Sequence, residues 1–596
     1  MSYLDRLAGL RAMMKNCQID CYIVPHSDEY QSEFLPPHSE RLAWLTGFNG
    51  SAGIAFILLD KAYLFVDGRY DIQVKKQVDS KSYEFRKLGV NSPYLSIFKE
   101  LIASMKIGYD PRLHLLDDID KIRKLSDSYN LKLVEIQHNL IDRLWSDKPP
   151  RSKNKIYQHN QVFSGVSYVD KVKNLSEELL YKNYQGYLIS SPDTLCWLYN
   201  LRGNDTPFTP LILAYAIVLP QEDKSIIFID LDRLEKDVYN LYSDYVEFVD
   251  EREFDNYLAN LNGRINSIAV DKNSASEWVC KKIQSKGIKI SKIEDPCAIA
   301  KSCKNITEQN GMRVAHERDG AALIKFLCWF DEEKGFNEIT ELNIVEKLDF
   351  FRAQGEHYMG PSFSTISAYA GNGAIIHYTP SKESNRLVSG DSLLLIDSGG
   401  QYLDGTTDVT RTVAVGKINA EQKLRFTQVL KGHIALASIK FPSRTKGGQL
   451  DVLARSYLWQ DNLDYDHGTG HGVGSFLGVH QGVQRIGKGL LGAELNIGMV
   501  LSNEPGYYKE NSYGIRIENL ILVKLSGGTN SEEKIKMYEF ETLTLVPIDK
   551  KLIDINILSQ SEINWINKYH EEVFKRISKY LGPKEKNWLI KATSKL

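Results

Sequence analysis

The amino-acid sequence predicts an α/β (α+β) protein in which two similar N-terminal domains precede a larger C-terminal domain. Three observations support this fold class. The length of 596 residues exceeds what one hydrophobic core accommodates. The first half contains an internal repeat, and the last 200 residues hold a set of acidic and histidine motifs. We expect the domains to span residues 1–154, 155–298 and 299–596.

The first segment has the pattern of alternating strands and helices. Short apolar runs bounded by turn residues indicate strands, and apolar residues spaced three or four apart indicate helices. Strands are expected at residues 21–26, 53–59 and 62–68, and amphipathic helices at residues 4–14 and 95–105. A polar, basic stretch with two prolines, residues 146–155, marks the end of this segment.

The second segment repeats this plan. Residues 19–50 and 184–203 each carry a strand, an aspartate, a Trp-Leu pair and a glycine turn in the same order. Residues 107–111 (IGYDP) and 268–272 (IAVDK) then occupy similar late positions. Two copies of one α/β domain explain the pattern, and the alternative is a coincidence between two ordinary α/β segments.

The third segment opens with a long helical pattern. Residues 306–330 keep helical spacing throughout, with Thr307 and Glu308 near the start. Further helices and strands are expected from there to the C-terminus.

The composition argues against several classes of protein. With 74 basic and 76 acidic residues, the chain lacks the basic excess of a nucleic-acid-binding protein or of a protein held at a membrane surface. Charges interrupt the apolar residues of the N-terminus, and no apolar run approaches the ~18 residues of a membrane span. We therefore expect no signal peptide and no membrane segment. The seven scattered cysteines are typical of reduced thiols in a cytoplasmic protein, which is the expected localisation.

Two aspartates stand on neighbouring strand patterns. Asp397 ends the apolar run SLLLID, and Asp408 lies in the β-rich run TTDVTRTVAV. A hairpin would place the two carboxylates about 5 Å apart, where they would repel each other. A divalent cation would remove that conflict. The alternative is a pair of turn or capping aspartates.

Two glutamates follow on later strand patterns. Glu504 precedes Pro505 and Gly506, which end its strand, although an exposed turn glutamate would have the same pattern. In GIRIENL, Arg516 and Glu518 share one face by alternation, so Arg516 is expected to hold Glu518 in position. The alternative there is a surface ion pair.

The segment HGTGHGVGSF places His467 and His471 among four glycines. These glycines exclude a stable zinc-binding helix, and their spacing differs from a dinucleotide loop. They are expected to let the backbone approach a metal or substrate closely. His377 and His480 are two further histidines nearby in the sequence.

Together, four carboxylates and one imidazole form a hard, oxygen-rich ligand set, which suits two divalent ions better than a structural zinc site. The order Asp, Asp eleven residues later, His, Glu, Glu resembles the metallopeptidases of the pita-bread fold. Among these it is most similar to aminopeptidase P, the cytosolic three-domain Xaa-Pro aminopeptidases. The resemblance includes the following motifs from all three segments: GFNGSAG, VDGRY, GPSF, GNGAIIHY, DSGGQYLDGTTDVTRT, HGTGHGVGSFLGVH, EPGYY, GIRIEN, LTLVPID and WINKYH.

This resemblance implies two creatinase-like N-terminal domains and a pita-bread catalytic domain with two metal ions, expected to be Mn²⁺, with Co²⁺ or Zn²⁺ as alternatives. It implies the following metal ligands: Asp397 for one ion, His471 for the other, Asp408 and Glu518 bridging both, and Glu504, which also handles the proton of the attacking water. It implies a catalytic His480 near the oxyanion, a catalytic His377, and substrate contacts from Arg69, His377, His467, His471, His480 and Glu504.

The implied activity is hydrolysis of the N-terminal Xaa-Pro bond of peptides with proline in second position. A homodimer is expected as well, with Trp459 as a candidate contact, although a tryptophan there could equally be buried. The main alternative is a prolidase-type dipeptidase, which usually has one N-terminal domain. Methionine aminopeptidases resemble only the third segment, and creatinase-like enzymes lack this ligand set. Partner-binding pita-bread domains of chromatin proteins form a separate class that the intact ligands argue against.

Overall fold

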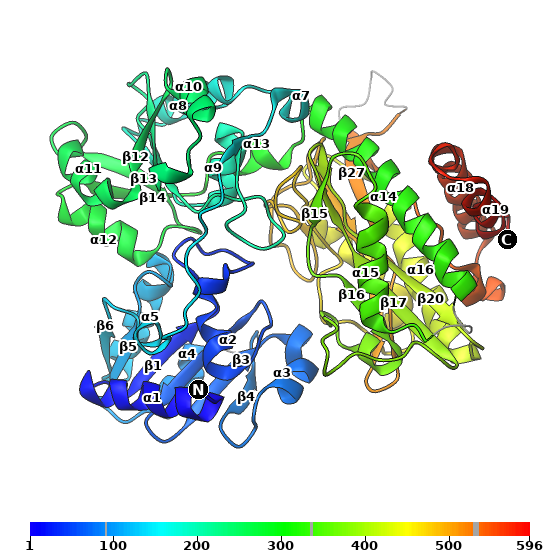
Figure 1. Ribbon diagram of the computed structural model, residues 1–596, viewed down its shortest axis with the longest axis horizontal. Coiled ribbons are helices and arrows are strands. Elements are labelled where there is room, and N and C mark those ends of the chain that lie inside the picture. Colours follow the sequence, from blue (N-terminus) through cyan, green and yellow to red (C-terminus); the bar gives the residue numbers. More distant parts are fainter. Residues whose placement is uncertain (90–91, 334–337, 528–535) are drawn as a thin grey trace. The chain divides into compact units, whose positions relative to one another are not determined.

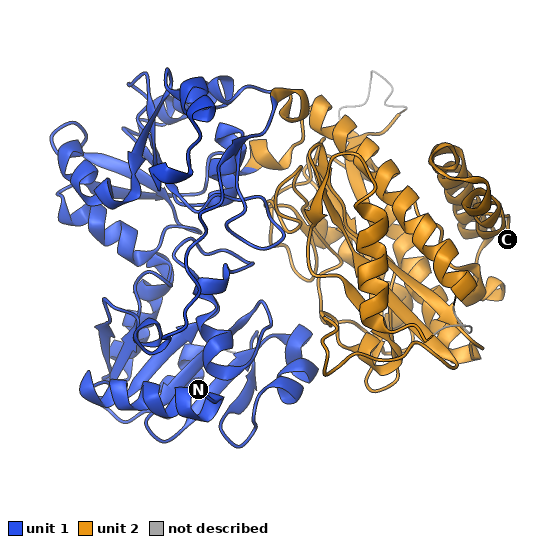
Figure 2. Cartoon of the chain, in the orientation of Figure 1, with its two compact units in different colours: residues 1–160, 166–298 blue, residues 161–165, 299–596 orange. Residues whose placement is uncertain are grey.

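The computed structural model describes residues 1–89, 92–333, 338–527 and 536–596. They form two compact units, shown in Figures 1 and 2: unit 1 contains residues 1–160 and 166–298, and unit 2 contains residues 161–165 and 299–596. Among the described residues, no helix is both long and apolar enough to cross a membrane. In the part of the chain that the structure describes, none of the seven cysteines forms a disulfide bond.

Unit 1 contains two six-stranded sheets with one topology. The first has the order β4-β3-β2-β1-β5-β6 and the second the order β12-β11-β10-β8-β13-β14. The first sheet comprises β1 (Cys21–Pro25), β2 (Gly53–Leu58), β3 (Ala62–Val66), β4 (Glu84–Lys87), β5 (Lys106–Tyr109) and β6 (Lys132–Glu135). The second comprises β8 (Tyr187–Ile189), β10 (Tyr215–Val218), β11 (Ser225–Ile229), β12 (Val246–Asp250), β13 (Ser267–Asp271) and β14 (Lys289–Ile293).

The strand directions also agree between the two sheets. The central strand, β1 or β8, is antiparallel to one neighbour and parallel to the other. The two late motifs fall on β5 and β13, which hold corresponding places in the two orders. The internal repeat predicted from the sequence is therefore confirmed, and so are the three strands expected in the first segment.

The helices of the first segment were predicted with mixed success. Helix α1 (Tyr3–Asn16) is present and is capped by Ser2. The helix expected over residues 95–105 is wrong beyond its first turn, because α4 (Pro93–Phe98) ends at Phe98. Ile102 is 71% exposed, so no core would bury another turn. Ser104 instead adopts a φ of 74° and turns the chain into β5.

A buried carboxylate connects the two halves of unit 1. Glu277, at the start of α12 (Glu277–Ser285), is fully buried. It accepts hydrogen bonds of 2.8 Å from the Tyr109 hydroxyl and from Arg123, both of the first half. Lys281 also pairs with this carboxylate at 2.9 Å. The bonds from Tyr109 and Arg123 therefore help to compensate a buried charge and link the two halves of unit 1.

Unit 2 is built from two helix pairs, each followed by an antiparallel sheet. Helices α14 (Ile306–Glu333) and α15 (Glu341–Arg352) pack together, as do α16 (Ala420–Ser438) and α17 (Asp451–Trp459). The predicted long helix is therefore confirmed as α14. The first sheet comprises β16 (Ile366–Tyr369), β17 (Ser392–Ser398) and β20 (Val409–Val415). The second comprises β21 (Lys440–Pro442), β28 (Met537–Thr542), β27 (Asn519–Leu525) and β24 (Val500–Asn503).

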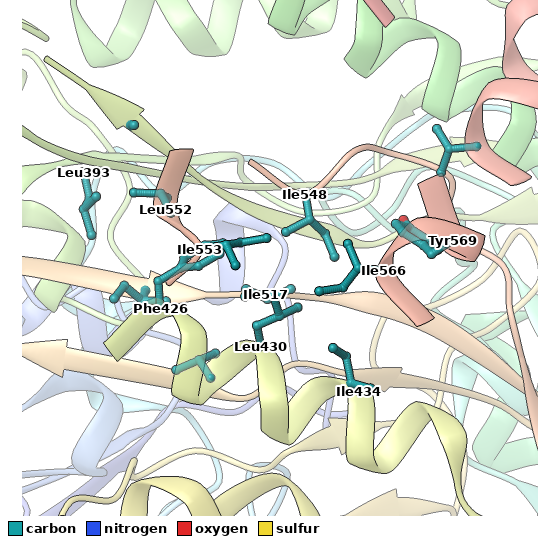
Figure 3. Close-up of a cluster of buried hydrophobic side chains, with 14 of the residues drawn as sticks. Leu393, Phe426, Leu430, Ile434, Ile517, Ile548, Leu552, Ile553, Ile566 and Tyr569 are labelled. Atoms are coloured by element: carbon teal, nitrogen blue, oxygen red, sulfur yellow. The ribbon is translucent and has the colours of Figure 1, made fainter. Parts of the chain in front are cut away.

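The core between α16 and helix α18 (Gln560–Ile577) is shown in Figure 3. Phe426, Leu430 and Ile434 form a stripe along α16, because residues four apart share a helix face. They pack in one cluster with Ile515 and Ile517, which are 0% and 1% exposed. Burial of these two isoleucines in the cluster turns the one side chain between them, Arg516, to the opposite face.

Candidate metal centre

The two aspartates are brought together by the pairing of β17 with β20. The strands are antiparallel, with Asp397 opposite Thr410, so the predicted pairing is confirmed. Asp408 directly precedes β20, and both carboxylates are buried. Gly399 lies between them, and a Cβ there would be 2.0 Å from the Thr407 carbonyl oxygen. Only glycine permits this close approach.

His471 reaches the aspartates from β22 (Gly470–His471). Its Nε2 lies 3.5 Å from Asp408 Oδ2 and 3.5 Å from Glu504 Oε1. A Cβ on Gly470 would be 2.1 Å from the carbonyl oxygen of Ser502 in β24. This glycine was expected to admit a metal or substrate. In the structure it admits the neighbouring strand, and so places His471 beside Glu504.

The two glutamates occupy strand ends of the second sheet. Glu504 follows β24, and the Ser502 hydroxyl donates to its Oε1 at 3.2 Å. Glu518 precedes β27, and the Thr410 hydroxyl donates to its Oε2 at 2.7 Å. One ligand atom each from Asp408, His471 and Glu518 lie within 4.8 Å of one another. Strand ends from both sheets therefore converge on one cluster.

Arg516 has a different partner from the one expected. It was predicted to hold Glu518, but its Nη2 donates to Asp397 at 2.5 Å and its Nε donates to Thr410 at 3.2 Å. Residues two apart on a strand lie about 6.6 Å from each other, whereas neighbouring strands lie closer. β17, which carries Asp397, packs beside β26 (Tyr513–Arg516). Arg516 therefore reaches Glu518 only through Thr410.

Tyr508 is a residue of the site that the sequence analysis missed. It lies in β25 (Gly506–Lys509), and its hydroxyl accepts a 2.6 Å hydrogen bond from Arg516. The same hydroxyl lies 2.8 Å from Nε2 of His467. The available signal was its place in the EPGYY motif that holds Glu504. Tyr508 thus connects the Arg516–Asp397 pair to His467, whose Nδ1 lies 3.9 Å from Glu504.

The remaining predicted residues lie at different distances from this cluster. The exposed His480 has its ring centroid 4.3 Å from that of His471. His377 is half-buried in the loop after η5 (Ala370–Ala374). Arg69 belongs to unit 1, where it pairs with Asp67. The substrate-binding roles of these side chains stay predictions.

Burial and mutual repulsion change the pKa values of the cluster. Burial raises the pKa of Asp397 to about 6, with Arg516 opposing the rise and Asp408 adding to it. Burial also raises the pKa of Glu504, and raises that of Glu518 well above its usual range. Burial opposes protonation of His471, but the adjacent carboxylates of Asp408 and Glu504 raise its pKa to about 9. The cluster therefore has a marked affinity for positive charge.

The donor set fits a pair of divalent cations. Four carboxylates and one imidazole are ligands that Mn²⁺ and related ions accept. The buried Oδ1 of Asp397 accepts no hydrogen bond from the described residues, so it is free to coordinate a cation. A structural zinc site would instead favour cysteine ligands, and the cluster has none.

Family models match four consecutive parts of the chain. Residues 310–524 match metallopeptidase family M24, and residues 536–596 match the C-terminal region of that peptidase. Residues 6–144 and 147–308 each match a creatinase/prolidase N-terminal domain. These two matches agree with the two sheets of equal topology in unit 1.

Several known proteins are similar to this chain over nearly its whole length. The probable Xaa-Pro aminopeptidase P of Laccaria bicolor is 39% identical, covering 99% of this chain and 93% of the relative. That of Aspergillus fumigatus is 38% identical, covering 99% and 92%. The X-prolyl aminopeptidase structure from Caenorhabditis elegans, described as a cytosolic enzyme with a di-nuclear active site, matches with a TM-score of 0.95 at 33% identity and covers 100% of both chains. A prolidase structure from Pyrococcus horikoshii shares the fold, with a TM-score of 0.51 at 23% identity. The match covers 64% of this chain and 99% of the prolidase chain.

Proposed function

This chain belongs to metallopeptidase family M24 and to the Xaa-Pro aminopeptidase P proteins within it, and we propose on that basis that it is a dinuclear metal-dependent aminopeptidase. It hydrolyses the peptide bond between the first residue and a proline in second position, and releases the first residue. The observation that carries the proposal is the convergence of Asp397, Asp408, His471, Glu504 and Glu518 at strand ends of both sheets.

The five residues have distinct proposed roles. Asp397, Asp408, His471, Glu504 and Glu518 would together hold the two ions, with Asp397 assigned to one, His471 to the other, and Asp408 and Glu518 assigned to both. When bound, such a pair of ions would supply Lewis-acid activation of water and of the carbonyl group of the first residue. The remaining chemistry falls to side chains of this chain.

Proton transfer is assigned to Glu504. Its carboxylate accepts a proton from the attacking water and delivers it to the prolyl nitrogen as the peptide bond breaks. The nitrogen of an Xaa-Pro bond is a tertiary amide without N–H, so it needs this proton to leave as a secondary amine. The hydroxyl of Ser502 keeps Oε1 of Glu504 oriented.

Three histidines are assigned to substrate binding. His480 is exposed beside His471, and it donates a hydrogen bond to the oxyanion as it develops. His467 is held by Tyr508 and lies near Glu504. His377 is assigned to the substrate from the loop after η5, and Arg69 is assigned to substrate binding as well.

Four further properties belong to this proposal. The physiological ions are Mn²⁺, with Co²⁺ or Zn²⁺ as alternatives, and the enzyme acts in the cytoplasm. The domains span residues 1–154, 155–298 and 299–596. The protein forms a homodimer through its catalytic domain, with Trp459 as a contact. That side chain is 44% exposed on α17, which argues against the alternative of a buried tryptophan.

Metal reloading tests the proposal. The protein is stripped with a chelator, reloaded with Mn²⁺, Co²⁺ or Zn²⁺, and assayed on the tripeptide Arg-Pro-Pro and the dipeptide Gly-Pro. We expect two ions per chain and cleavage of the tripeptide by the reloaded protein only. Cleavage confined to the dipeptide would instead support a prolidase-type dipeptidase. Equal cleavage by the stripped and reloaded forms would contradict metal dependence.

A further inference from the structure

A fully buried carboxylate outside the metal cluster closes the loop that carries His377. Glu341 is the first residue of α15 and is 0% exposed. Its Oε1 accepts the N–H of Tyr369 at 2.7 Å, and its Oε2 accepts the N–H of Arg386 at 3.0 Å. These two amides stand just before and just after the segment 370–385, so one side chain fixes both ends of the loop.

The same carboxylate also binds the interior of the loop. Oε2 accepts a 2.7 Å hydrogen bond from the hydroxyl of Tyr378, the residue after His377. The side-chain amide of Asn372 lies 3.1 Å from each carboxylate oxygen. Burying a carboxylate is costly, but several donors around one carboxylate compensate that cost. Because all these donors must be in place to offset the cost of burying the carboxylate, the loop is held in one conformation.

The other side of the loop lies against the strand that leads to Arg516. A Cβ on Gly373 would be 2.8 Å from the backbone nitrogen of Gly514 in β26, so the two backbones are in close contact. The loop is therefore held between Glu341 on one side and β26 on the other. Glu518 lies two residues beyond the end of β26. The strand that packs against the His377 loop therefore leads directly to a residue of the metal cluster.

We propose that Glu341 is a positioning residue, which fixes loop 370–385 and thereby holds the His377 imidazole at the substrate site. The inference rests on the proposed function, because His377 has a substrate role only if the chain is a peptidase. Glu341 itself touches no reacting atom. Its effect on the reaction passes through the loop.

A double-mutant cycle tests this dependence. We expect Glu341→Ala to lower kcat/KM for Arg-Pro-Pro about 10- to 100-fold, since small misplacements of a catalytic group cost that much. The same substitution in a His377→Ala background should change the rate by less than about threefold, because the group that Glu341 positions is already gone. Glu341→Gln keeps one acceptor oxygen, so its kcat/KM should lie between those of the wild type and Glu341→Ala. If the loss in kcat/KM of the double variant equals the product of the losses of the two single variants, the proposal is overturned.

A second measurement needs no turnover. Hydrogen exchange on the metal-free protein should show faster exchange in residues 369–386 of Glu341→Ala, with β17 and β20 unchanged. Glu562→Ala is the matched control, because Glu562 also lies in the first turn of a helix and accepts hydrogen bonds from Ser559 and Lys431. It should leave both kcat/KM and the exchange of this loop unaltered.

The outcomes separate the two proposals. If the wild-type protein cleaves Arg-Pro-Pro but the cycle is multiplicative, the Glu341 inference fails and the proposed function stands. If the wild-type protein cleaves no Xaa-Pro peptide, the proposed function fails, and the positioning role fails with it. Unchanged exchange in loop 369–386 of Glu341→Ala would overturn the inference in either case.

Discussion

Replacing Arg516 by methionine should weaken metal binding without removing a ligand. Arg516 is 2% exposed and pairs with Asp397, which lies in the low-dielectric interior. An adjacent arginine lowers the pKa of an aspartate by about 1–3 pKa units. The pKa of Asp397 is already raised to about 6 with Arg516 present. Without the arginine, Asp397 should be largely protonated at pH 7.

The magnitude follows from the competition between proton and metal. Each unit by which the pKa of Asp397 exceeds the working pH lowers the affinity for the metal ion about tenfold, or by about 1.4 kcal/mol. We therefore expect Arg516→Met to lower the affinity of one ion about 10- to 100-fold at pH 7, in line with the usual effect of residues that orient ligands. The deficit should shrink at pH 8.5, where Asp397 loses its proton more readily.

The assay is competition for Mn²⁺ against a chromogenic chelator at both pH values. Arg352→Met is the matched control, because Arg352 is equally buried and pairs with Asp319 away from the ligands. Both variants should lose about 3–5 kcal/mol of stability, the usual cost of breaking a buried ion pair. Only Arg516→Met should lose metal affinity. Unchanged affinity in Arg516→Met, or equal losses in both variants, would refute the reasoning.

Three further predictions follow from the site. Asp408→Ala should abolish activity and leave fewer than two ions per chain by plasma mass spectrometry; full metal content with a near-normal rate would contradict its proposed bridging role. His480→Ala should keep its metals but lose about 10²–10³-fold in kcat, whereas a rise in KM alone would restrict His480 to substrate binding. The pKa values of Asp397 (about 6) and His471 (about 9) are raised in the metal-free folded protein, so the unfolded chain releases these protons at lower pH. The free energy of unfolding of the metal-free protein should therefore fall as pH rises from about 4 to 6 for Asp397, and from about 6.5 to 9 for His471. Mn²⁺ should therefore raise Tm more at pH 8 than at pH 5.5 in scanning fluorimetry, and an equal or smaller rise at pH 8 would argue against this linkage.

The sequence predicted those parts of the fold that local patterns encode. The apolar run that ends in Asp397 and the β-rich run that carries Asp408 indicated paired strands, and the observed register places the two carboxylates at one end of the pair. The repeat in the first half predicted two equal sheets, which the topology confirms. These features depend on local composition and on the order of motifs, and both can be read along the chain.

The sequence could not predict partners that come from distant strands. Alternation placed Arg516 and Glu518 on one face, but the nearest acceptor for Arg516 comes from β17, 119 residues away along the chain. Thr410, which orients Glu518, and Tyr508, which connects Arg516 with His467, were missed for the same reason. Their contacts are set by tertiary packing.

The most direct test of the proposed activity compares three peptides with the Mn²⁺-loaded protein. Arg-Pro-Pro should release free arginine, because its second residue is proline and its N-terminus is free. Arg-Ala-Pro should remain intact, and so should N-acetylated Arg-Pro-Pro, whose terminal charge has been removed. Liquid chromatography of the products separates these outcomes. Comparable cleavage of Arg-Ala-Pro or of the acetylated peptide would leave the metallopeptidase fold in place but would contradict an Xaa-Pro aminopeptidase activity.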